Sequence, residues 1–419
     1  MIDINFIRQN PEKVKEGIAK KNTDPKLVEK FLRLDEAWRS KTAALDQLKA
    51  EQNILNKELS KARSEDLVSK AQIIKRRVTE IVAERNKQEE KRDEILNQLP
   101  NPPFEDVPVG KSEADNKVLR EVGEKPKFKF QVKDYLTIGE SLNLINVKKA
   151  AEVTSSRFGY LLGDAAILEF ALVQLAMETA VKEGFLPVVP PVMIRPEVFT
   201  GMGRLASSQK DERYFLSKDN LYLVGSAEHT LGPLHMNEVL EVETLPRRYV
   251  GFSTCFRREA GSYGKDTKGI LRVHQFDKIE MFSFANPKDS EKEHEFMLGI
   301  QEKLMKALEL PYRVVAISTG DMGWTDARQY DIETWLPGQN NYRETHSCSN
   351  TTDFQSRGIN AKYRDKNSDK KYVHMLNGTA FAIGRIIIAI LENYQNEDGT
   401  VRVPKALQDY LGKKVIGKN

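Results

Sequence analysis

Apolar residues recur three and four positions apart through a segment near the start of the chain, between residues 27 and 99, that contains neither glycine nor proline. This is the heptad spacing of helices that pack against each other along one seam. One ladder of apolar residues runs from Leu27 to Ala62, and a second runs from Leu67 to Leu99. Each ladder predicts one long helix.

The two predicted helices are separated only by a few polar residues around Arg63 to Asp66. Such a short connection indicates a single antiparallel hairpin whose seam pairs with itself. In that register Lys41 lies opposite Gln88 and Leu45 lies opposite Arg85, so the polar interruptions share one layer. At 1.5 Å per residue each helix would reach about 50 Å, and the hairpin should project as an arm.

The predicted tip of this arm is basic, because Lys and Arg outnumber Asp and Glu by seven to three between Lys57 and Arg77. A solvated helix face accounts for that charge, and so does a surface that binds a phosphate backbone. Proline follows at residues 100, 102 and 103, where it cannot continue the second helix. We therefore predict an N-terminal domain over residues 1–103, with the arm at about 27–99, and a second domain over 104–419.

After the prolines the pattern changes to apolar strands mixed with a few long helices. The strands do not alternate regularly with helices, so an α+β fold built on an antiparallel sheet with flanking helices fits better than a doubly wound fold. The predicted strands are 249–257, 270–284, 312–317, 330–335 and 372–376, and the predicted helices are 164–183 and 380–394.

Composition limits where the protein works and what it binds. Lys and Arg exceed Asp and Glu by only four, so the chain is not a uniformly basic nucleic-acid coat. The two cysteines, Cys255 and Cys348, form no CxxC pair, so we expect a reducing, cytoplasmic compartment and no zinc site. The longest apolar run, 386–391, is too short to span a bilayer, so we expect no membrane segment.

Two stretches carry residues suited to phosphate chemistry. The first, 256–280, is predicted to be a strand, a glycine-rich loop and a second strand, and it contains Arg257 and Glu259. A P-loop is excluded because Glu259 occupies the position where that motif needs its first glycine. In the second stretch Arg385 lies just inside an almost wholly apolar helix, where a charge is unfavourable unless paired, so an anionic ligand is expected there.

The stretch 256–280 strongly resembles motif 2 of class II aminoacyl-tRNA synthetases, in the form typical of the seryl enzymes. Residues 376–385 resemble motif 3, and the helix 164–183 with Pro190 and Pro191 resembles motif 1. The resemblance spans essentially the whole chain, including the arm. It implies a class II catalytic domain, activation of L-serine with ATP, transfer to tRNA(Ser) held by the coiled-coil arm, and a homodimer.

The resemblance also implies residue roles toward ATP. Arg257 would contact the α-phosphate, Glu259 the adenine amino group and Arg385 the γ-phosphate, while Phe276 would stack on the purine; ordinary sheet packing is the alternative for that ring. Arg257, Glu344 and Arg385 are the expected catalytic residues. The expected ATP-binding set is Arg257, Arg258, Glu259, Val273, His274, Gln275, Phe276, Glu344, Thr345, His346, Ser347 and Arg385.

A magnesium site is implied at Glu344 and Ser347, because carboxylate and hydroxyl oxygens suit Mg²⁺ bound together with ATP. The usual seryl form of this strand is Glu-Ile-Ser-Ser, whereas this chain has Thr345 and His346 in the middle. These departures concern details of the ATP pocket.

Serine must be distinguished from alanine and threonine. A buried polar partner for the hydroxyl can reject the analogue that lacks it by about 10⁴ to 10⁵. The resemblance assigns that work to Glu280 and Thr379, and it places Arg257 and the segment Ser226, Ala227 and Glu228 against the amino acid. The following residues, His229 to Gly232, are unusual for the family, and the sequence offers no physical account of them.

Two other functions remain open at this level. One is a synthetase-like paralogue that activates an amino acid but loads a carrier protein or nothing. The other is an inactive RNA-binding scaffold, although such a chain would be expected to lose Arg257, Glu344 or Arg385. Serylation of tRNA(Sec) is a further expectation where the host has that tRNA.

Overall fold

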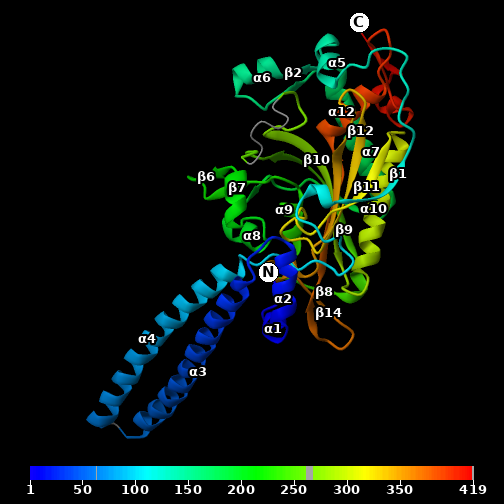
Figure 1. Cartoon of the computed structure of the whole chain (residues 1–419). Coiled ribbons are helices and arrows are strands. Elements are labelled where there is room, and N and C mark those ends of the chain that lie inside the picture. Colours follow the sequence, from blue (N-terminus) through cyan, green and yellow to red (C-terminus); the bar gives the residue numbers. More distant parts are fainter. Residues whose placement is uncertain (63, 261–267, 418–419) are drawn as a thin grey trace. The chain divides into compact units, whose positions relative to one another are not determined.

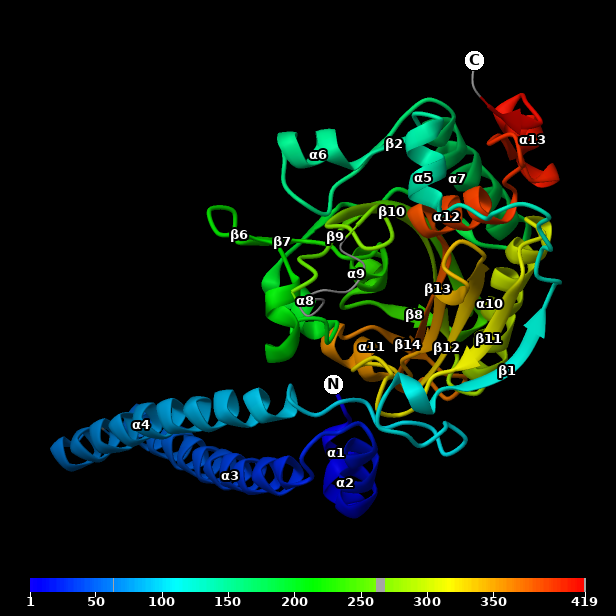
Figure 2. The same ribbon diagram turned by 45° about the horizontal axis from the view of Figure 1, so that its top comes forward.

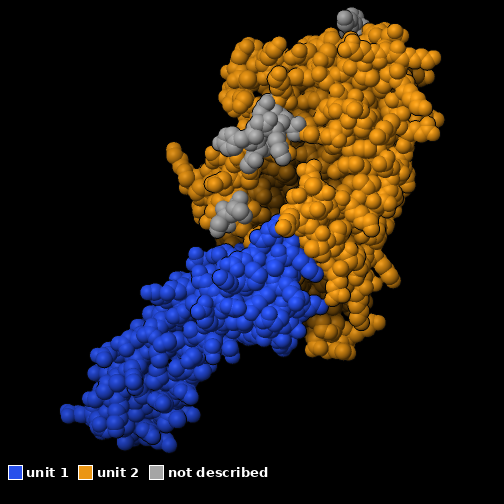
Figure 3. Space-filling model, viewed as in Figure 1, with its two compact units in different colours: residues 1–100 blue, residues 101–419 orange. Residues whose placement is uncertain are grey.

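The structure is a computed structural model that describes residues 1–62, 64–260 and 268–417, divided into two compact units, residues 1–100 and 101–419 (Figure 3). Arg63, in the predicted turn of the arm, lies outside the described residues. So does the segment 261–267, which belongs to the glycine-rich loop predicted in motif 2.

The first unit consists of four helices, α1 (Ile4–Gln9), α2 (Pro11–Lys20), α3 (Lys26–Lys61) and α4 (Glu65–Leu96). The long helices α3 and α4 lie side by side as one antiparallel hairpin (Figure 1). Helix α4 begins after Ser64, whose hydroxyl accepts a hydrogen bond from the backbone N–H of Leu67. The predicted helical arm is confirmed.

Contacts across the hairpin fit the predicted register. The Arg92 guanidinium lies 4.3 Å from the centroid of the Trp38 ring, and Lys41 forms an ion pair with Glu84. Leu45 is buried in the seam. Two polar interruptions of the heptads, Lys41 and Arg92, therefore each have a partner on the opposite helix.

The second unit is built on an eight-stranded sheet in the order β1-β11-β12-β13-β16-β10-β9-β4. All neighbours are antiparallel except β4 and β9, which are parallel. The predicted α+β class with an antiparallel sheet is confirmed. The strands are β1 (Lys117–Val122), β4 (Leu186–Val188), β9 (Arg247–Phe256), β10 (Gln275–Ala285), β11 (Tyr312–Ala316), β12 (Arg328–Leu336), β13 (Asn341–Asn350) and β16 (His374–Ala382).

Three long helices cover one side of this sheet: α7 (Asp164–Lys182), α10 (Ser290–Ala307) and α12 (Ile383–Asn393) (Figure 2). Their apolar residues join those of the strands in the largest core cluster. Residues alternate between the two faces of a strand, so Ile279 and Met281 of β10 belong to this core while Glu280 between them does not. Shorter helices are α5 (Tyr135–Ser141), α6 (Val147–Val153), α8 (Pro196–Gly201), α9 (Glu228–Leu231), α11 (Phe354–Ile359) and α13 (Gln408–Leu411).

Several boundaries differ from the predictions. The strand predicted from residue 270 begins at Gln275, and the helix predicted from residue 380 begins at Ile383. The reason for the second difference is that Phe381 and Ala382 still pair with β10, and a short apolar run carries no period that separates strand from helix. The amphipathic helix α10 was not predicted. Among the described residues, no helix is long and apolar enough to cross a membrane.

Candidate active site

A cavity of about 280 Å³ opens beside the strands β10, β13 and β16. It brings together residues from both sequence stretches that suggested phosphate chemistry and from the strand between them. The predicted residues that line it are Arg257, Glu259, Val273, Phe276, Glu344, Thr345, Ser347, Thr379 and Arg385.

Arg257 is fixed at the end of β9 by three contacts. Its Nε donates to the carbonyl oxygen of Gly225 at 3.1 Å, and its guanidinium carbon lies 5.2 Å from the centroid of the Phe276 ring. Its backbone N–H donates to the carbonyl oxygen of His274 at 2.9 Å. The guanidinium and the Phe276 ring are therefore held side by side at one wall.

Arg385 finds its anionic partner within the chain. Its Nη1 donates to the carbonyl oxygen of Glu344 at 2.7 Å and lies 3.2 Å from the Glu344 carboxylate. Desolvation alone would raise the pKa of Glu344, but Arg385, and then Arg257 and Lys278, lower it below its ordinary value. The Glu344 side chain is 49% exposed, so this ion pair is open to an incoming phosphate.

A buried ion pair lies next to the cavity. The Lys278 Nζ is 2.5 Å from Glu280 Oε2 and 3.4 Å from the Ser226 hydroxyl oxygen. Glu280 is fully buried, and burial raises the pKa of its carboxyl although Lys278 opposes the shift. Among the described residues, Glu280 Oε1 has no hydrogen-bond partner. One carboxylate oxygen is therefore left to accept a hydrogen bond.

The segment predicted to contact the amino acid lies beside this pair. The Ser226 hydroxyl is 3.4 Å from Glu280 Oε2, and Ala227 is fully buried. Glu228 is instead bound by Arg204, whose Nε donates to Glu228 Oε1 at 2.7 Å. The structure thus places Ser226 at the pair and Ala227 in a core cluster with Phe282, and it binds the Glu228 carboxylate to Arg204.

Four residues of the predicted ATP-binding set do not line this cavity. Arg258 is exposed, with its guanidinium 5.8 Å from the Tyr214 ring. The His274 Nδ1 lies 3.0 Å from the carbonyl oxygen of Arg257, and Gln275 faces a neighbouring cavity. His346 is buried against Phe381, and burial lowers the pKa of its imidazole to about 3.

Thr345 lines the cavity, but its hydroxyl is used within the fold. It donates to the carbonyl oxygen of Ile332 at 3.2 Å and lies 2.8 Å from the Thr334 hydroxyl and 2.9 Å from the His346 Nδ1. The two departures from the usual strand sequence are thus bonded to each other.

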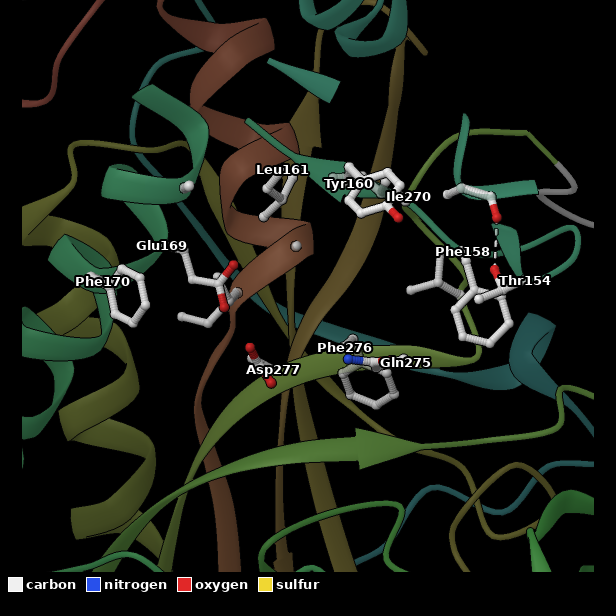
Figure 4. A pocket seen from close by; sticks show the side chains of 16 residues that line it. Thr154, Phe158, Tyr160, Leu161, Glu169, Phe170, Ile270, Gln275, Phe276 and Asp277 are labelled. Atoms are coloured by element: carbon white, nitrogen blue, oxygen red, sulfur yellow. Dashed lines mark hydrogen bonds between the residues drawn. The ribbon is translucent and has the colours of Figure 1, made fainter. Parts of the chain in front are cut away.

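The neighbouring cavity, of about 380 Å³, shares Phe276 with the first (Figure 4). Its wall is mainly apolar, and Glu169 of α7 and Asp277 of β10 point toward one another across it (Figure 4). Burial and the Asp277 carboxylate raise the pKa of Glu169 to about 8. Phe276, together with Ile270, Val273 and Gly384, therefore lines two cavities of different character.

Two family models match the chain. The model of the seryl-tRNA synthetase N-terminal domain matches residues 1–103, and that of the class II tRNA synthetase core domain (G, H, P, S and T) matches residues 214–394. A serine–tRNA ligase of Acidothermus cellulolyticus is 44% identical over 419 residues, covering 99% of each chain. The chain belongs to the seryl-tRNA synthetase family. The predicted activity, ATP-dependent activation of serine and its transfer to tRNA, is confirmed, and nothing supports the two alternative functions.

Solved structures of seryl-tRNA synthetases superpose over the full chain. The enzyme of Pyrococcus horikoshii, solved with ATP, is 40% identical with a TM-score of 0.93 and full coverage of both chains. The cytoplasmic enzyme of Naegleria fowleri, solved with AMP, is 35% identical with a TM-score of 0.87, covering 100% of this chain and 99% of that one.

The sequence interpretation of this seryl-tRNA synthetase missed several residues of the cavity. Lys278 is the most important, and it could have been found because it lies two positions before Glu280 on a strand, hence on the same face. Asp331 of β12 lies opposite Ser347 in the sheet, and burial, together with the Glu344 carboxylate, raises the pKa of Asp331. Arg272 also lines the cavity and donates to Glu259 at 3.0 Å.

The residues predicted to hold Mg²⁺ face the same cavity. Glu344 and Ser347 offer a carboxylate and a hydroxyl, which are hard oxygen ligands. Across residues 1–62, 64–260 and 268–417 there is no group of three or more His, Cys, Asp or Glu side chains that could hold a metal. Two protein ligands fit a cation that takes its remaining ligands from water and phosphate.

Proposed function

We propose that the Lys278–Glu280 pair and the cavity above it form the serine and ATP sites of this synthetase. The observation that carries the proposal is the free Oε1 of a fully buried Glu280, next to the Ser226 hydroxyl and the Thr379 side chain. A buried carboxylate oxygen that lacks a hydrogen bond is unfavourable, so a hydroxyl that donates to Oε1 gains a charge-assisted hydrogen bond. Alanine cannot make that bond.

Discrimination against threonine needs steric exclusion instead. Ala227 and Thr379 are both almost fully buried, so their positions have little freedom to yield to an added methyl group. We propose that these two residues, with Ser226, Glu228 and Arg257, shape the serine pocket.

Adenylate formation places negative charge on the phosphoryl oxygens while the serine carboxylate attacks the α-phosphorus. Positioned cations stabilise that charge. We propose that Arg257 contacts the α-phosphate, and that Arg385 moves from Glu344 to the γ-phosphate when ATP binds. Phe276 would stack on the purine, with Glu259 at its amino group.

The departure of Arg385 would free the Glu344 carboxylate. We propose that Glu344 and Ser347 then hold Mg²⁺, which neutralises phosphate charge and orients the phosphates. Mg²⁺ would then supply, beside the Glu344 carboxylate, the positive charge that Arg385 supplies in the unliganded site. No zinc is proposed.

We propose that residues 1–103 bind tRNA and that residues 104–419 catalyse both half-reactions. The basic residues near the tip of the arm, among them Lys70, Lys75 and Arg76, are solvent-exposed. An exposed cation on a long helix suits a phosphate backbone. The proposed ligands are tRNA(Ser) and, where the host has it, tRNA(Sec).

We also propose a homodimer and a cytoplasmic location. Large apolar side chains are exposed on α7 and near β4, where Phe170 is 66% and Val189 is 83% exposed. Exposed large apolar side chains on neighbouring elements support the proposal of a protein interface there. Both cysteines are free and buried, which suits a reducing compartment.

The test of the serine site is amino-acid-dependent ATP/pyrophosphate exchange by Glu280→Gln. The amide keeps the shape but removes the charge, so the preference for serine over alanine should fall by at least about tenfold. Glu293→Gln is the matched control, because Glu293 is also buried and bonded to an arginine, Arg248, at 2.7 Å. An unchanged preference in Glu280→Gln would refute the assignment.

A further inference from the structure

The two strands that carry the proposed magnesium and serine ligands separate at the active site. Strands β13 and β16 pair at three positions, ending with Cys348 opposite Gly378. Ser347 and Thr379 would form the next pair, but the pairing stops before them. Their hydroxyl oxygens remain 3.4 Å apart at the cavity. The active site thus begins where the ladder of hydrogen bonds ends.

A side chain from α10 bridges the strands at this point. Gln301 is fully buried, and its Nε2 donates to the carbonyl oxygens of Ser347 and Thr379, each at 2.8 Å. A glutamine amide nitrogen carries two hydrogens, one for each carbonyl. The amide therefore occupies the place of the missing bonds between the strands.

The amide is packed closely against the strands. A Cβ atom at Gly378 would lie only 3.3 Å from Gln301 Nε2 and 3.3 Å from both Cys348 Sγ and Met297 Cε. Little space is left for the amide to move away from the two carbonyls. Its other atom, Oε1, is buried without a hydrogen-bond partner among the described residues. Burial of the Oε1 atom without a hydrogen bond is unfavourable and needs an explanation. The two hydrogen bonds donated by Nε2 explain why a glutamine is placed here.

We propose that Gln301 is a positioning residue for serine activation, and that its bridge sets the separation of Ser347 from Thr379. In this role Gln301 does not contact the substrate. It would fix the distance between Ser347, on the side of the site that binds Mg²⁺ and the phosphates, and Thr379, on the side that binds serine. The inference rests on the roles proposed above for Ser347 and Thr379. Helix α10 is thereby given a part in catalysis from the far face of the sheet.

The test compares Gln301→Met with Met297→Leu in the full-length enzyme. Methionine fills a similar volume but donates no hydrogen bond, and Met297 is a buried residue of the same helix one turn away. A displacement of about 1 Å at a reacting site can cost about 100-fold, so kcat/KM for serine in exchange should fall about 10- to 100-fold in Gln301→Met. Met297→Leu should stay within about threefold of wild type.

Two further readouts do not depend on how much of the enzyme is folded. They are the ratio of kcat/KM for serine to that for threonine and the Mg²⁺ concentration that gives half-maximal exchange. Both should change in Gln301→Met, and also in Gln301→Glu, whose carboxyl donates no hydrogen bond when ionised and only one when neutral, in place of two. If both quantities match wild type in both variants, the positioning role is refuted.

Thr379→Val and Ser347→Ala separate this inference from the proposed site. If these variants alter the two quantities while the Gln301 variants do not, the site assignment stands and the role of Gln301 is wrong. If Thr379→Val and Ser347→Ala leave both quantities at the wild-type values, the assignment of the site itself is wrong.

Discussion

Removal of Lys278 tests the buried pair directly, because Lys278→Met leaves Glu280 without its cation. Glu280 is fully buried and the Lys278 side chain, at the wall of the cavity, is 8% exposed, so water that enters from the cavity would stabilise the carboxylate less than the ammonium group does. Loss of one partner of such a pair costs about 3 to 5 kcal/mol when the other stays charged. The carboxyl can instead take up a proton, which removes the buried charge.

The free-energy cost of protonating Glu280 sets how much stability Lys278→Met loses and how that loss depends on pH. Holding a carboxyl with an ordinary pKa of about 4.3 in its neutral form costs about 1.36 kcal/mol for each pH unit above that value, or about 3.7 kcal/mol at pH 7. In the variant the folded-state pKa of Glu280 is raised above its unfolded value, so the folded state binds the additional proton. Its free energy of unfolding, relative to wild type, should therefore fall as pH rises, by about 1.4 kcal/mol per unit.

The assay is urea unfolding at pH 6, 7 and 8, followed by tryptophan fluorescence. A Trp38→Phe background limits the signal to Trp324 and Trp335, which both lie in the second unit. Lys278→Arg keeps a cation and should lose little stability. The double variant Lys278→Met with Glu280→Gln has no group to titrate at this position. Its free energy of unfolding, relative to wild type, should therefore not change with pH. A Lys278→Met variant that is as stable as wild type at every pH would show that the pair is not buried as described.

The other predictions concern the metal site and the arm. Glu344→Gln should stay folded, because the side chain is half exposed, but should need a higher Mg²⁺ concentration for exchange; an unchanged requirement would make Glu344 structural. Removal of residues 30–96, with the ends joined, should leave exchange largely intact and abolish charging of tRNA, and efficient charging by the shortened enzyme would refute the role of the arm. Charge reversal at Lys70, Lys75, Arg76 and Arg77 should weaken tRNA binding most at low salt and lower the salt slope by about 0.7 to 0.9 for each phosphate that the arm no longer neutralises.

The features of the fold that depend on local periodicity could be predicted from the sequence. The heptads gave the hairpin and its register, and the Trp38–Arg92 contact fits the predicted pairing. Helix α10 also carried a readable signal, since Ile300 and Leu304 are four residues apart and both buried, although it was not recognised. The start of α12 could not be placed, because only pairing with β10 keeps Phe381 in a strand.

The residues of the site also fall into those that the sequence indicates and those that only the folded structure brings together. Arg257, Glu280, Glu344 and Arg385 were predicted from the resemblance, and Lys278 could have been predicted from strand alternation. The bond between Glu228 and Arg204 could not, since these residues meet only through the fold. The same holds for the Gln301 bridge, which depends on where two strands stop pairing. The motifs therefore predict single residues of the site but not the contacts between segments that are distant in the sequence.

The most direct test of the central claim is amino-acid-dependent ATP/pyrophosphate exchange by the purified protein, followed by aminoacylation of total tRNA. Serine should support exchange far better than alanine or threonine, and the same amino acid should appear on tRNA. Exchange that depends on another amino acid, or serine activation with no transfer to tRNA, would contradict the account.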